Sequence, residues 1–371
     1  MANLTELYRI DNFIDTFALG HYARVLAARD QRNGATIAFK VMRPEHLSEG
    51  GDPRWEYRAF PHEAALLMAL YESPNTVKML DCGYLSAQGE VPIEGEIVSY
   101  GQDAELFASS MQRHAEKQWR PYMTLEMLPR TGNLFYLMKP SSQSNRWRLP
   151  SEEGLALALQ FGQLLKLAHQ SRILYMDHKL EHVYWDGYKL QVIDFNSSRQ
   201  LENNDDRQWR VDIHNLCVGI LYPIFTGLSP MKTTLRPQPS NIDEVDARYR
   251  DITTLDFGVE PGLSQALQDL LQRGAAMQIP DADTFIAEIR KVAALHGWDF
   301  SDHYTSPASR DARDHMRAGL RKLREGQANL REARDLFRDA VILDGITDDL
   351  EDELRRLVKA ANDMLNSRVI P

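Results

Sequence analysis

The chain has 371 residues, of which 43% are hydrophobic, and carries a formal net charge of −10 at pH 7. This length and apolar content are enough for two folded lobes with sizeable cores and a small extra domain. The negative charge argues against a nucleic-acid backbone as the main partner, because such a partner attracts clustered Lys and Arg.

The cysteines and the apolar segments indicate in which cellular compartment the protein is expected. Cys82 and Cys217 lie far apart, in a predicted strand and a predicted helix. Such spacing does not indicate a disulfide framework and favours a reducing compartment. No basic and then apolar segment begins the chain, and no apolar run approaches the length of a membrane span. We therefore expect a cytoplasmic protein with no membrane partner.

The first predicted elements form a hairpin and a helix. Residues 17–25 and 33–41 read as alternating strands joined by a tight turn at Asn33 and Gly34. Lys40 then lies on the second strand. The helical apolar spacing of residues 60–70 predicts a helix that carries Glu63.

Two acidic residues on predicted loops carry most of the functional information. After a buried strand at 122–128 and an amphipathic helix at 155–168, Asp177 and Asp194 each follow an apolar stretch. Phosphoryl transfer needs two such acids, because one orients a hydroxyl nucleophile while the other binds the metal on the phosphates. The sequence therefore indicates phosphotransferase chemistry.

The tail has a different character from the rest of the chain. From about residue 306 it is charge-rich and helical, and Ala333, Phe337 and Ala340 have the spacing of the second helix of a tetratricopeptide repeat. A further helix is predicted over 347–365, with an apolar stripe. One repeat cannot bury its apolar face alone, so these helices pack on the large lobe, stack with another chain or receive a partner helix.

These landmarks occur in the order and spacing of the eukaryotic-type Ser/Thr protein kinases, which the chain resembles over roughly residues 10–300. The resemblance implies an α+β, bilobal protein kinase-like fold, with an antiparallel-sheet N-lobe, a helical C-lobe and a small helical C-terminal extension. The implied domains are the N-lobe at 1–128, with an insertion at about 86–120, the C-lobe at 129–305 and the tetratricopeptide-like tail at 306–371.

The same resemblance implies a site for ATP, with magnesium or manganese, between the lobes. Asp177 and Lys179 match the catalytic residues of the family, while Asp194 and His182 stand where the family has its metal ligands. Lys40 is expected to contact the α- and β-phosphates and to pair with Glu63. The residues expected to bind ATP are Lys40, Glu63, Gly20, Val25, Ala38, Glu126 and Leu128.

Further residues are expected to support this site. By resemblance, Asp212 holds the backbone of the catalytic loop, and Leu125 is the gatekeeper next to the adenine. An apolar column that joins the lobes in this family is expected to contain Leu67, Leu80, Tyr175 and Phe195.

Two departures from the family pattern affect phosphate and metal binding. The family has three glycines in the loop that covers the phosphates, and the corresponding residues here are Ala18, Gly20 and Ala23. A Cβ at two of these positions hinders close approach of the backbone to the phosphates. His182 replaces an asparagine ligand, and imidazole suits manganese or zinc better than magnesium.

Two further departures lie after Asp194. Asn196 replaces a glycine, in a place where Asn is the best-tolerated substitute in left-handed backbone. The segment between Asp194 and Asp212 is shorter than in the family and lacks Ala-Pro-Glu. The platform that holds a peptide substrate is therefore missing or rebuilt.

Three interpretations of the function stay open. A divergent Ser/Thr kinase that acts on a protein hydroxyl is favoured by the retained Lys40, Asp177, Lys179 and Asp194. A pseudokinase scaffold, with a signalling partner bound through the C-terminal helices, is favoured by the four departures. A small-molecule kinase of the aminoglycoside or choline type shares the short segment after the metal-binding aspartate. Those families, however, keep the asparagine that is His182 here.

Overall fold

The computed structural model describes residues 2–13, 22–48, 50–138, 148–203, 206–229, 248–258, 260–298, 300, 311, 312, 314–316, 318, 319, 322, 329–343 and 345–366. The chain divides into two compact units. The small unit contains residues 1–129, 171–175 and 191–201, and the large unit contains residues 130–170, 176–190 and 202–371. Gly20, with Ala18, lies outside the described residues.

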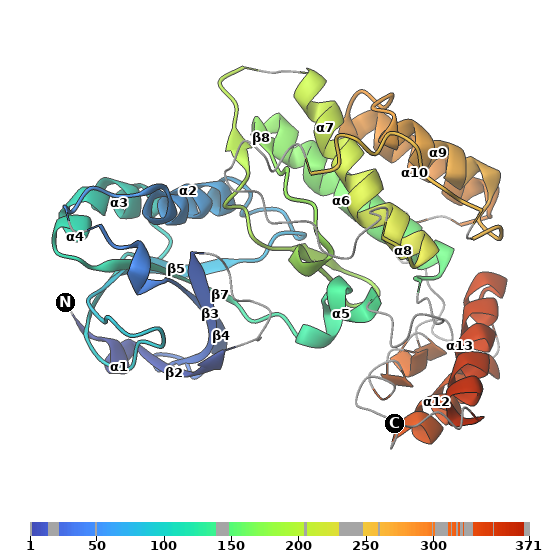
Figure 1. The fold of residues 1–371 in the computed structure, drawn as a ribbon, viewed down its shortest axis with the longest axis horizontal. Coiled ribbons are helices and arrows are strands. Elements are labelled where there is room, and N and C mark those ends of the chain that lie inside the picture. Colours follow the sequence, from blue (N-terminus) through green and yellow to red (C-terminus); the bar gives the residue numbers. More distant parts are fainter. Residues whose placement is uncertain are drawn as a thin grey trace. The chain divides into compact units, whose positions relative to one another are not determined.

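A curled antiparallel sheet forms the body of the small unit (Figure 1). Within the described residues it has seven strands, in the spatial order β1-β6-β5-β7-β4-β3-β2. Alternating apolar residues place one row of side chains in its core, which includes Leu26, Phe39 and Tyr122. The strands are β1 (Ala2–Asn3), β2 (Tyr8–Phe13), β3 (Ala23–Asp30), β4 (Thr36–Met42), β5 (Met79–Leu85), β6 (Glu96–Ser99) and β7 (Arg120–Glu126).

The predicted hairpin is β3 and β4, and its register pairs Val25 with Lys40. Its first strand was predicted over 17–25 and is Ala23–Asp30, so the two share only residues 23–25. Its turn is wider than predicted. The peptide N–H of Asp30 donates to the carbonyl of Ala35, at 2.9 Å, so residues 31–34 form the loop. Gly34 has φ of 73°, a backbone conformation that glycine adopts without a steric penalty. The Asn-Gly pair therefore indicated the hairpin but not the type of its turn.

Helix α2 (Trp55–Ala69) packs against β5 and β7 and carries Glu63. The sequence predicted this helix over 60–70, so its start was placed too late. Pro61 lies inside the helix, and its apolar ring is buried with Phe60. Before α2 the small unit has α1 (Leu4–Leu7) and a 3-10 turn, η1 (Pro44–His46).

The segment predicted as an insertion, at about 86–120, contains β6, α3 (Ala104–Ser109) and α4 (Met111–Glu116). It packs closely on the sheet. Its last residue, Arg120, is fully buried, and its guanidinium donates to the carbonyls of Met42, Ala87 and Gly89 at 2.7–3.0 Å. These bonds tie both ends of the segment to the sheet.

Helices form most of the large unit (Figure 1). Helix α6 packs against α10, where Gly162 allows close approach because a Cβ there would lie 2.9 Å from Ile286 and 3.0 Å from Phe285. The helices are α5 (Leu134–Met138), α6 (Ser151–Gln170), α7 (Asp206–Leu216), a π-turn (Cys217–Leu221), α8 (Tyr222–Thr226), α9 (Gln265–Ala275) and α10 (Ala282–Leu295). Shorter elements are η2 (Arg130–Gly132), β8 (Ile173–Leu174), η3 (Leu180–His182), β9 (Val183–Trp185), β10 (Leu190–Val192) and β11 (Arg199–Gln200). Of these, β8, β11 and the last two residues of β10 belong to the small unit.

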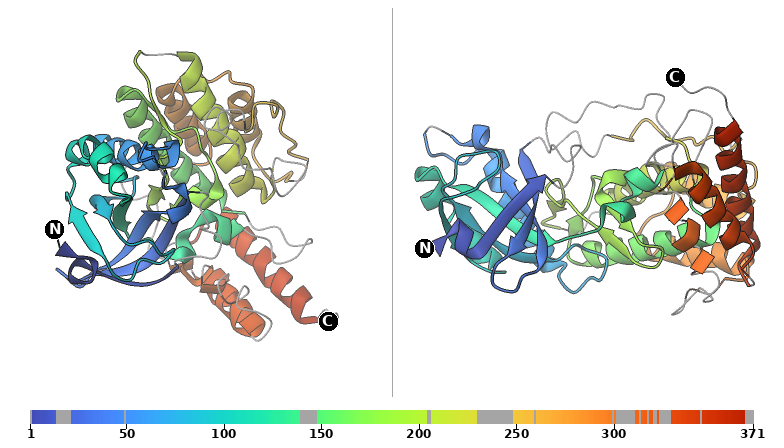
Figure 2. Two further views of the ribbon diagram at one scale, coloured as in Figure 1. Left: turned by 60° about the vertical axis from the view of Figure 1, so that its left-hand side comes forward. Right: turned by 90° about the horizontal axis from the view of Figure 1, so that it is seen from below.

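The tail helices α12 (Leu330–Val341) and α13 (Asp348–Asn366) pack side by side (Figure 2). Their shared core includes Ala333, Phe337 and Ala340 from α12. Gly319 lies against this core, since a Cβ there would be 2.2 Å from the ring of Phe337. The likeness to a tetratricopeptide repeat stays a prediction.

The tail is attached to the start of α6 by polar contacts. Arg148 contacts Glu353 at 3.3 Å, and Asp349 accepts a hydrogen bond from the backbone N–H of Ser151. The tail therefore contacts the large unit, and stacking with another chain or binding of a partner helix stays a prediction.

Both cysteines are buried as free thiols. Across the described residues, no helix combines the length and the apolar character that a membrane span requires.

Candidate active site

Lys40 is the centre of a buried ionic cluster in the small unit. Its Nζ atom lies 2.6 Å from Oε2 of Glu63 and 3.0 Å from Oδ1 of Asp194. The side chains of Lys40 and Glu63 are only 7% and 1% exposed, whereas that of Asp194 is 26% exposed. Strand β4, helix α2 and the loop after β10 thus bring together the three charged groups that the sequence predicted for this part of the site.

The cluster keeps Lys40 charged. Burial alone would lower the pKa of Lys40, but the carboxylates of Asp194 and Glu63 outweigh it and hold this pKa well above its usual value. Burial raises the pKa of Glu63, against the effect of Lys40. A cation fixed between two acids can place its charge on a phosphate without rearrangement.

The backbone after β10 is held in place around Asp194. Asp194 has φ of 63°, and the N–H of Phe195 donates to Oε1 of Glu63 at 3.3 Å. His62, beside Glu63 on α2, contacts the carbonyl of Ser198 through Nε2 at 2.7 Å. Adjacent residues of α2 therefore position both Lys40 and the segment that carries Asp194.

The predicted apolar column is confirmed for the contact of Tyr175 with Phe195 and is wrong for Leu80. Leu67, Tyr175 and Phe195 are buried, and the rings of Tyr175 and Phe195 lie 5.1 Å apart. Leu80 is 41% exposed, because it points outward from β5 beside a register shift between Met79 and Asp81.

Asn196 has a different role from the one expected. It does not have a positive φ, and the left-handed residue of this loop is Asp194. Its side-chain amide donates to the phenol oxygen of Tyr22, and its Oδ1 accepts from Ser197. Tyr22 also lies under Lys40, with Nζ 5.5 Å from the ring centroid. Sequence reasoning missed Tyr22, for which nearness to Gly20 was the only available signal.

The remaining predicted ATP-binding residues of the small unit lie on β3, β4 and β7 or just after β7. Ala38 is buried on β4, Val25 is partly buried, and Leu128 is partly exposed just after β7. Glu126 donates its peptide N–H to Lys78, and its side chain accepts from the N–H of Lys78 and from Gln191. An adenine contact at Glu126 would therefore use its carbonyl oxygen.

Asp212 holds the backbone of the loop at 176–182 in the large unit, as expected. Its Oδ1 accepts from the N–H of Met176 at 2.8 Å, and Oδ2 lies 3.1 Å from Nε2 of His169. Met176 has φ of 65°, and its carbonyl accepts from Asn215. Burial would raise the pKa of Asp212, but the hydrogen bonds that it accepts from His169 and from the N–H of Met176 hold this pKa below its usual value.

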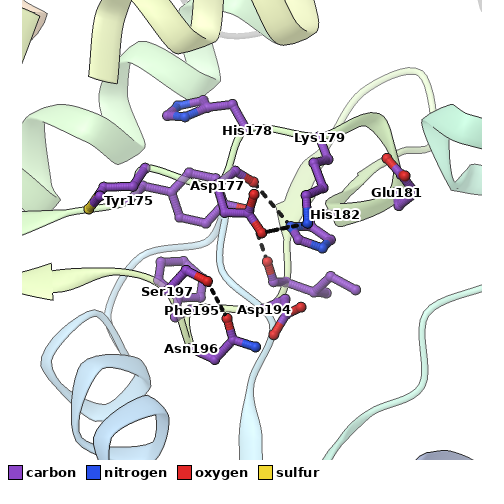
Figure 3. Close-up of polar contacts among 12 residues, drawn as sticks. Tyr175, Asp177, His178, Lys179, Glu181, His182, Asp194, Phe195, Asn196 and Ser197 are labelled. Atoms are coloured by element: carbon purple, nitrogen blue, oxygen red, sulfur yellow. Dashed lines mark hydrogen bonds and ion pairs between the residues drawn. The ribbon is translucent and has the colours of Figure 1, made fainter. Parts of the chain in front are cut away.

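Asp177, the residue after Met176, lies beside Lys179 and His182 (Figure 3). Lys179 Nζ lies 2.8 Å from Oδ2, and Arg248 Nη2 lies 3.0 Å from Oδ1. Burial would raise the pKa of Asp177, but His182, Lys179 and Arg248 together hold it below its usual value. The carboxylate is therefore ionised at neutral pH. Arg248 was missed by sequence reasoning, because it lies 71 residues downstream.

His182 lies on the same loop and faces Asp177. Its Nδ1 is 3.1 Å from the backbone oxygen of Asp177 and 3.7 Å from Oδ2. The described residues contain no group of three His, Cys, Asp or Glu side chains arranged to hold a metal ion. The role of His182 as a metal ligand stays a prediction.

Comparison with known proteins supports the fold. No protein-family model and no curated protein matches the chain. The structure is similar to that of the kinase PK-1 of the Cydia pomonella granulovirus, with a TM-score of 0.50 and 15% sequence identity, over 76% of this chain and 94% of that chain. At this identity the likeness shows the fold alone. The chain has an α+β, protein kinase-like fold.

Proposed function

We propose that this protein is an ATP-dependent phosphotransferase that acts on a protein hydroxyl. The observation that carries the proposal is the contact of Lys40 with both Glu63 and Asp194. In kinases of this fold, the lysine–glutamate pair and the metal-binding aspartate must both be in place for transfer.

The residues of the small unit fit a nucleotide with a bound metal ion. Bound ATP would supply the γ-phosphoryl group, and its metal ion would neutralise charge on the phosphates. Lys40 suits phosphate oxygens as a desolvated point charge, and Asp194 supplies the carboxylate oxygen that magnesium prefers. Magnesium is usually held by one or two carboxylates together with substrate phosphates, so a site of three protein ligands is not required.

The residues of the large unit fit the acceptor hydroxyl. Asp177 is ionised and can accept a hydrogen bond from that hydroxyl, which orients its oxygen for attack. Lys179 can place positive charge where negative charge develops on the transferred group. Most of the rate would come from positioning, since the transition state of phosphoryl transfer needs little covalent help from the protein.

A second function, a nucleotide-binding scaffold, is favoured by His182. The imidazole stands where the family has a metal-ligating asparagine, and it contacts the loop that carries Asp177. A chain with one metal site can bind ATP and still transfer phosphate poorly. The tail helices then supply the surface for a signalling partner.

The test is transfer of labelled γ-phosphate from ATP by the purified full chain to a generic protein acceptor and to itself, with magnesium and separately with manganese. The control is Asp177→Asn, which keeps the shape of the side chain and removes its charge. Transfer by the wild type that is lost in this variant supports the enzyme. Binding of ATP without transfer in either metal supports the scaffold, and no binding of ATP refutes both functions.

Binding is tested separately with Lys40→Ala. We expect weaker ATP binding by calorimetry, because the buried cation that would contact the phosphates is removed. An unchanged affinity in this variant would show that Lys40 does not hold the nucleotide.

A further inference from the structure

Two cations from distant parts of the chain hold the carboxylate of Asp177. Lys179 contacts Oδ2 at 2.8 Å, while Arg248 contacts Oδ1 at 3.0 Å. The Asp177 and Arg248 side chains are only 4% and 8% exposed. Since each oxygen has its own cation, rotation of the carboxylate about its Cβ–Cγ bond would break two charge-assisted contacts.

The residue after Arg248 fixes it to the catalytic loop. The phenol O–H of Tyr249 donates to the carbonyl of His178 at 2.7 Å, and its backbone oxygen lies 3.0 Å from Nε2 of His214. Tyr249 is buried, and Gly219 allows its ring to approach. A Cβ at Gly219 would lie 2.7 Å from that ring and 2.8 Å from the carbonyl of His178. The contact of Arg248 with Asp177 thus belongs to a closely packed interface.

The segment after Asp194 is short, which gives weight to the packing of residues 248 and 249 on the catalytic loop. In the small unit, Arg199 and Gln200 pair with Leu174 and Ile173. Helix α7 of the large unit then begins at Asp206. The sequence therefore has little length there with which to build a platform next to Asp177. Residues 248 and 249 lie beyond α8 in the chain and pack on the catalytic loop instead.

We propose that Arg248 is a positioning residue for phosphoryl transfer, which fixes the carboxylate of Asp177 so that it can orient the acceptor hydroxyl. This inference rests on the proposed function. Arg248 suits the task because its planar guanidinium constrains the direction of a contact more than the flexible stem of a lysine does. It acts through Asp177 and is not itself a catalytic residue.

The division of work between the two cations follows from their chemistry. Lys179, a mobile point charge, can turn from Asp177 towards the transferred phosphoryl group as negative charge develops. Arg248 would keep Asp177 paired during that movement. A buried carboxylate that lost its only cation would carry a large desolvation cost, so a second cation lowers the barrier to the movement of Lys179.

The experiment measures kcat and KM for ATP in the full chain for Arg248→Gln and Arg248→Lys. We expect Arg248→Gln to lower kcat about 100-fold, since loss of positioning by about 1 Å costs that much, with KM for ATP nearly unchanged. Arg248→Lys keeps the charge and should recover part of the rate. Tyr249→Phe removes only the hydrogen bond to His178 and should lower kcat in the same direction by a smaller factor.

The matched control is Arg250→Gln, an exposed arginine two residues further along, which should transfer phosphate as the wild type does. If the wild type is active and Arg248→Gln keeps its kcat, the inference is wrong while the proposed function stands. A parallel rise in KM for ATP with unchanged kcat would refute it as well. If the wild type transfers no phosphate, the proposed function fails, and the inferred role of Arg248 in catalysis fails with it.

A second measurement is independent of transfer. Urea unfolding of Asp177→Asn, Arg248→Gln and the double variant forms a double-mutant cycle. We expect the change in urea midpoint of the double variant to differ from the sum of the changes in the two single variants. Each single variant leaves one of the two buried side chains without the other. Additive midpoints would show that the two side chains do not interact in solution, and would overturn the inference whatever the activity.

Discussion

The side-chain amide of Asn196 donates a hydrogen bond to the phenol oxygen of Tyr22, 174 residues away in the chain. Tyr22 lies just before β3, and Asn196 lies two residues after Asp194. The pair thus connects the start of β3, the strand that pairs with the strand of Lys40, to the loop that carries Asp194, the proposed metal ligand. A glycine at position 196, as the family has, could not make this bond.

Loss of this bond should weaken nucleotide binding. Tyr22→Phe keeps the ring beside Lys40 but removes the phenol oxygen, so Asp194 loses one restraint. One hydrogen bond contributes about 1 kcal/mol, which corresponds to roughly fivefold weaker binding of ATP by calorimetry. Asn196→Gly should have a similar effect. Tyr84→Phe, which removes another buried phenol oxygen of the small unit, serves as control. Unchanged affinity in both test variants would contradict the prediction.

The ion pair of Lys40 with Glu63 should also support the stability of the small unit. Lys40→Met leaves the carboxylate of Glu63 buried without its cation, which typically costs about 3–5 kcal/mol of unfolding free energy. The double variant Lys40→Met, Glu63→Gln removes the orphaned charge and should recover most of that loss. Urea unfolding monitored by fluorescence measures both. The prediction fails if the double variant is no more stable than the single one.

Acid should destabilise the large unit through Asp212. The folded-state pKa of Asp212 lies below its usual value of 3.8, so its contribution is complete above about pH 4 and is lost as pH falls through the lowered folded pKa. Protonation then weakens the bonds to Met176 and His169. We expect the unfolding free energy of Asp212→Asn to be lower near neutral pH and to fall less steeply than that of the wild type from about pH 4 downwards.

Urea midpoints measured from about pH 6 to about pH 3 test this difference. Asp256→Asn is the control, since Asp256 is exposed. Its curve should follow the wild type at every pH. Parallel curves for the wild type and Asp212→Asn would refute the prediction.

The attachment of the tail should depend on Arg148. Its guanidinium lies 3.3 Å from Glu353, 3.6 Å from Asp349 and 3.9 Å from Glu260. Burial raises the pKa of Glu353, and the charge of Arg148 opposes this effect. Arg148→Ala should therefore increase amide hydrogen exchange in α13 by about tenfold or more, because the buried carboxylate of Glu353 keeps only Arg356 and the link from α13 to the start of α6 is lost.

Arg355→Ala provides the matched control for the tail. Arg355 is 62% exposed on α13 and contacts Glu351 four residues before it, an interaction worth only about 0.3–0.5 kcal/mol. Exchange in α13 should change little in this variant. Equal exchange in the Arg148 and Arg355 variants would mean that Arg148 does not hold the tail.

The elements with strong local patterns were predictable from the sequence. The alternation in β3 and β4 and the helical spacing in α2 are encoded by neighbouring residues, so the hairpin and the helix were found. The first strand, the turn and the start of α2 were nevertheless misplaced. Leu80 was misassigned because a register shift in β5 changes which face a residue occupies, and such a shift leaves no mark in apolar periodicity.

The sequence by itself determined the order of the charged residues on their strands, helices and loops, because apolar periodicity specifies those elements locally. Only the tertiary structure decided that Tyr22 meets Asn196 and that Arg248 meets Asp177. Such contacts between polar side chains have no period, and they depend on which buried surfaces pack together over many intervening residues. For this reason the proposed chemistry could be read from the chain, whereas the residues that hold it in position could not.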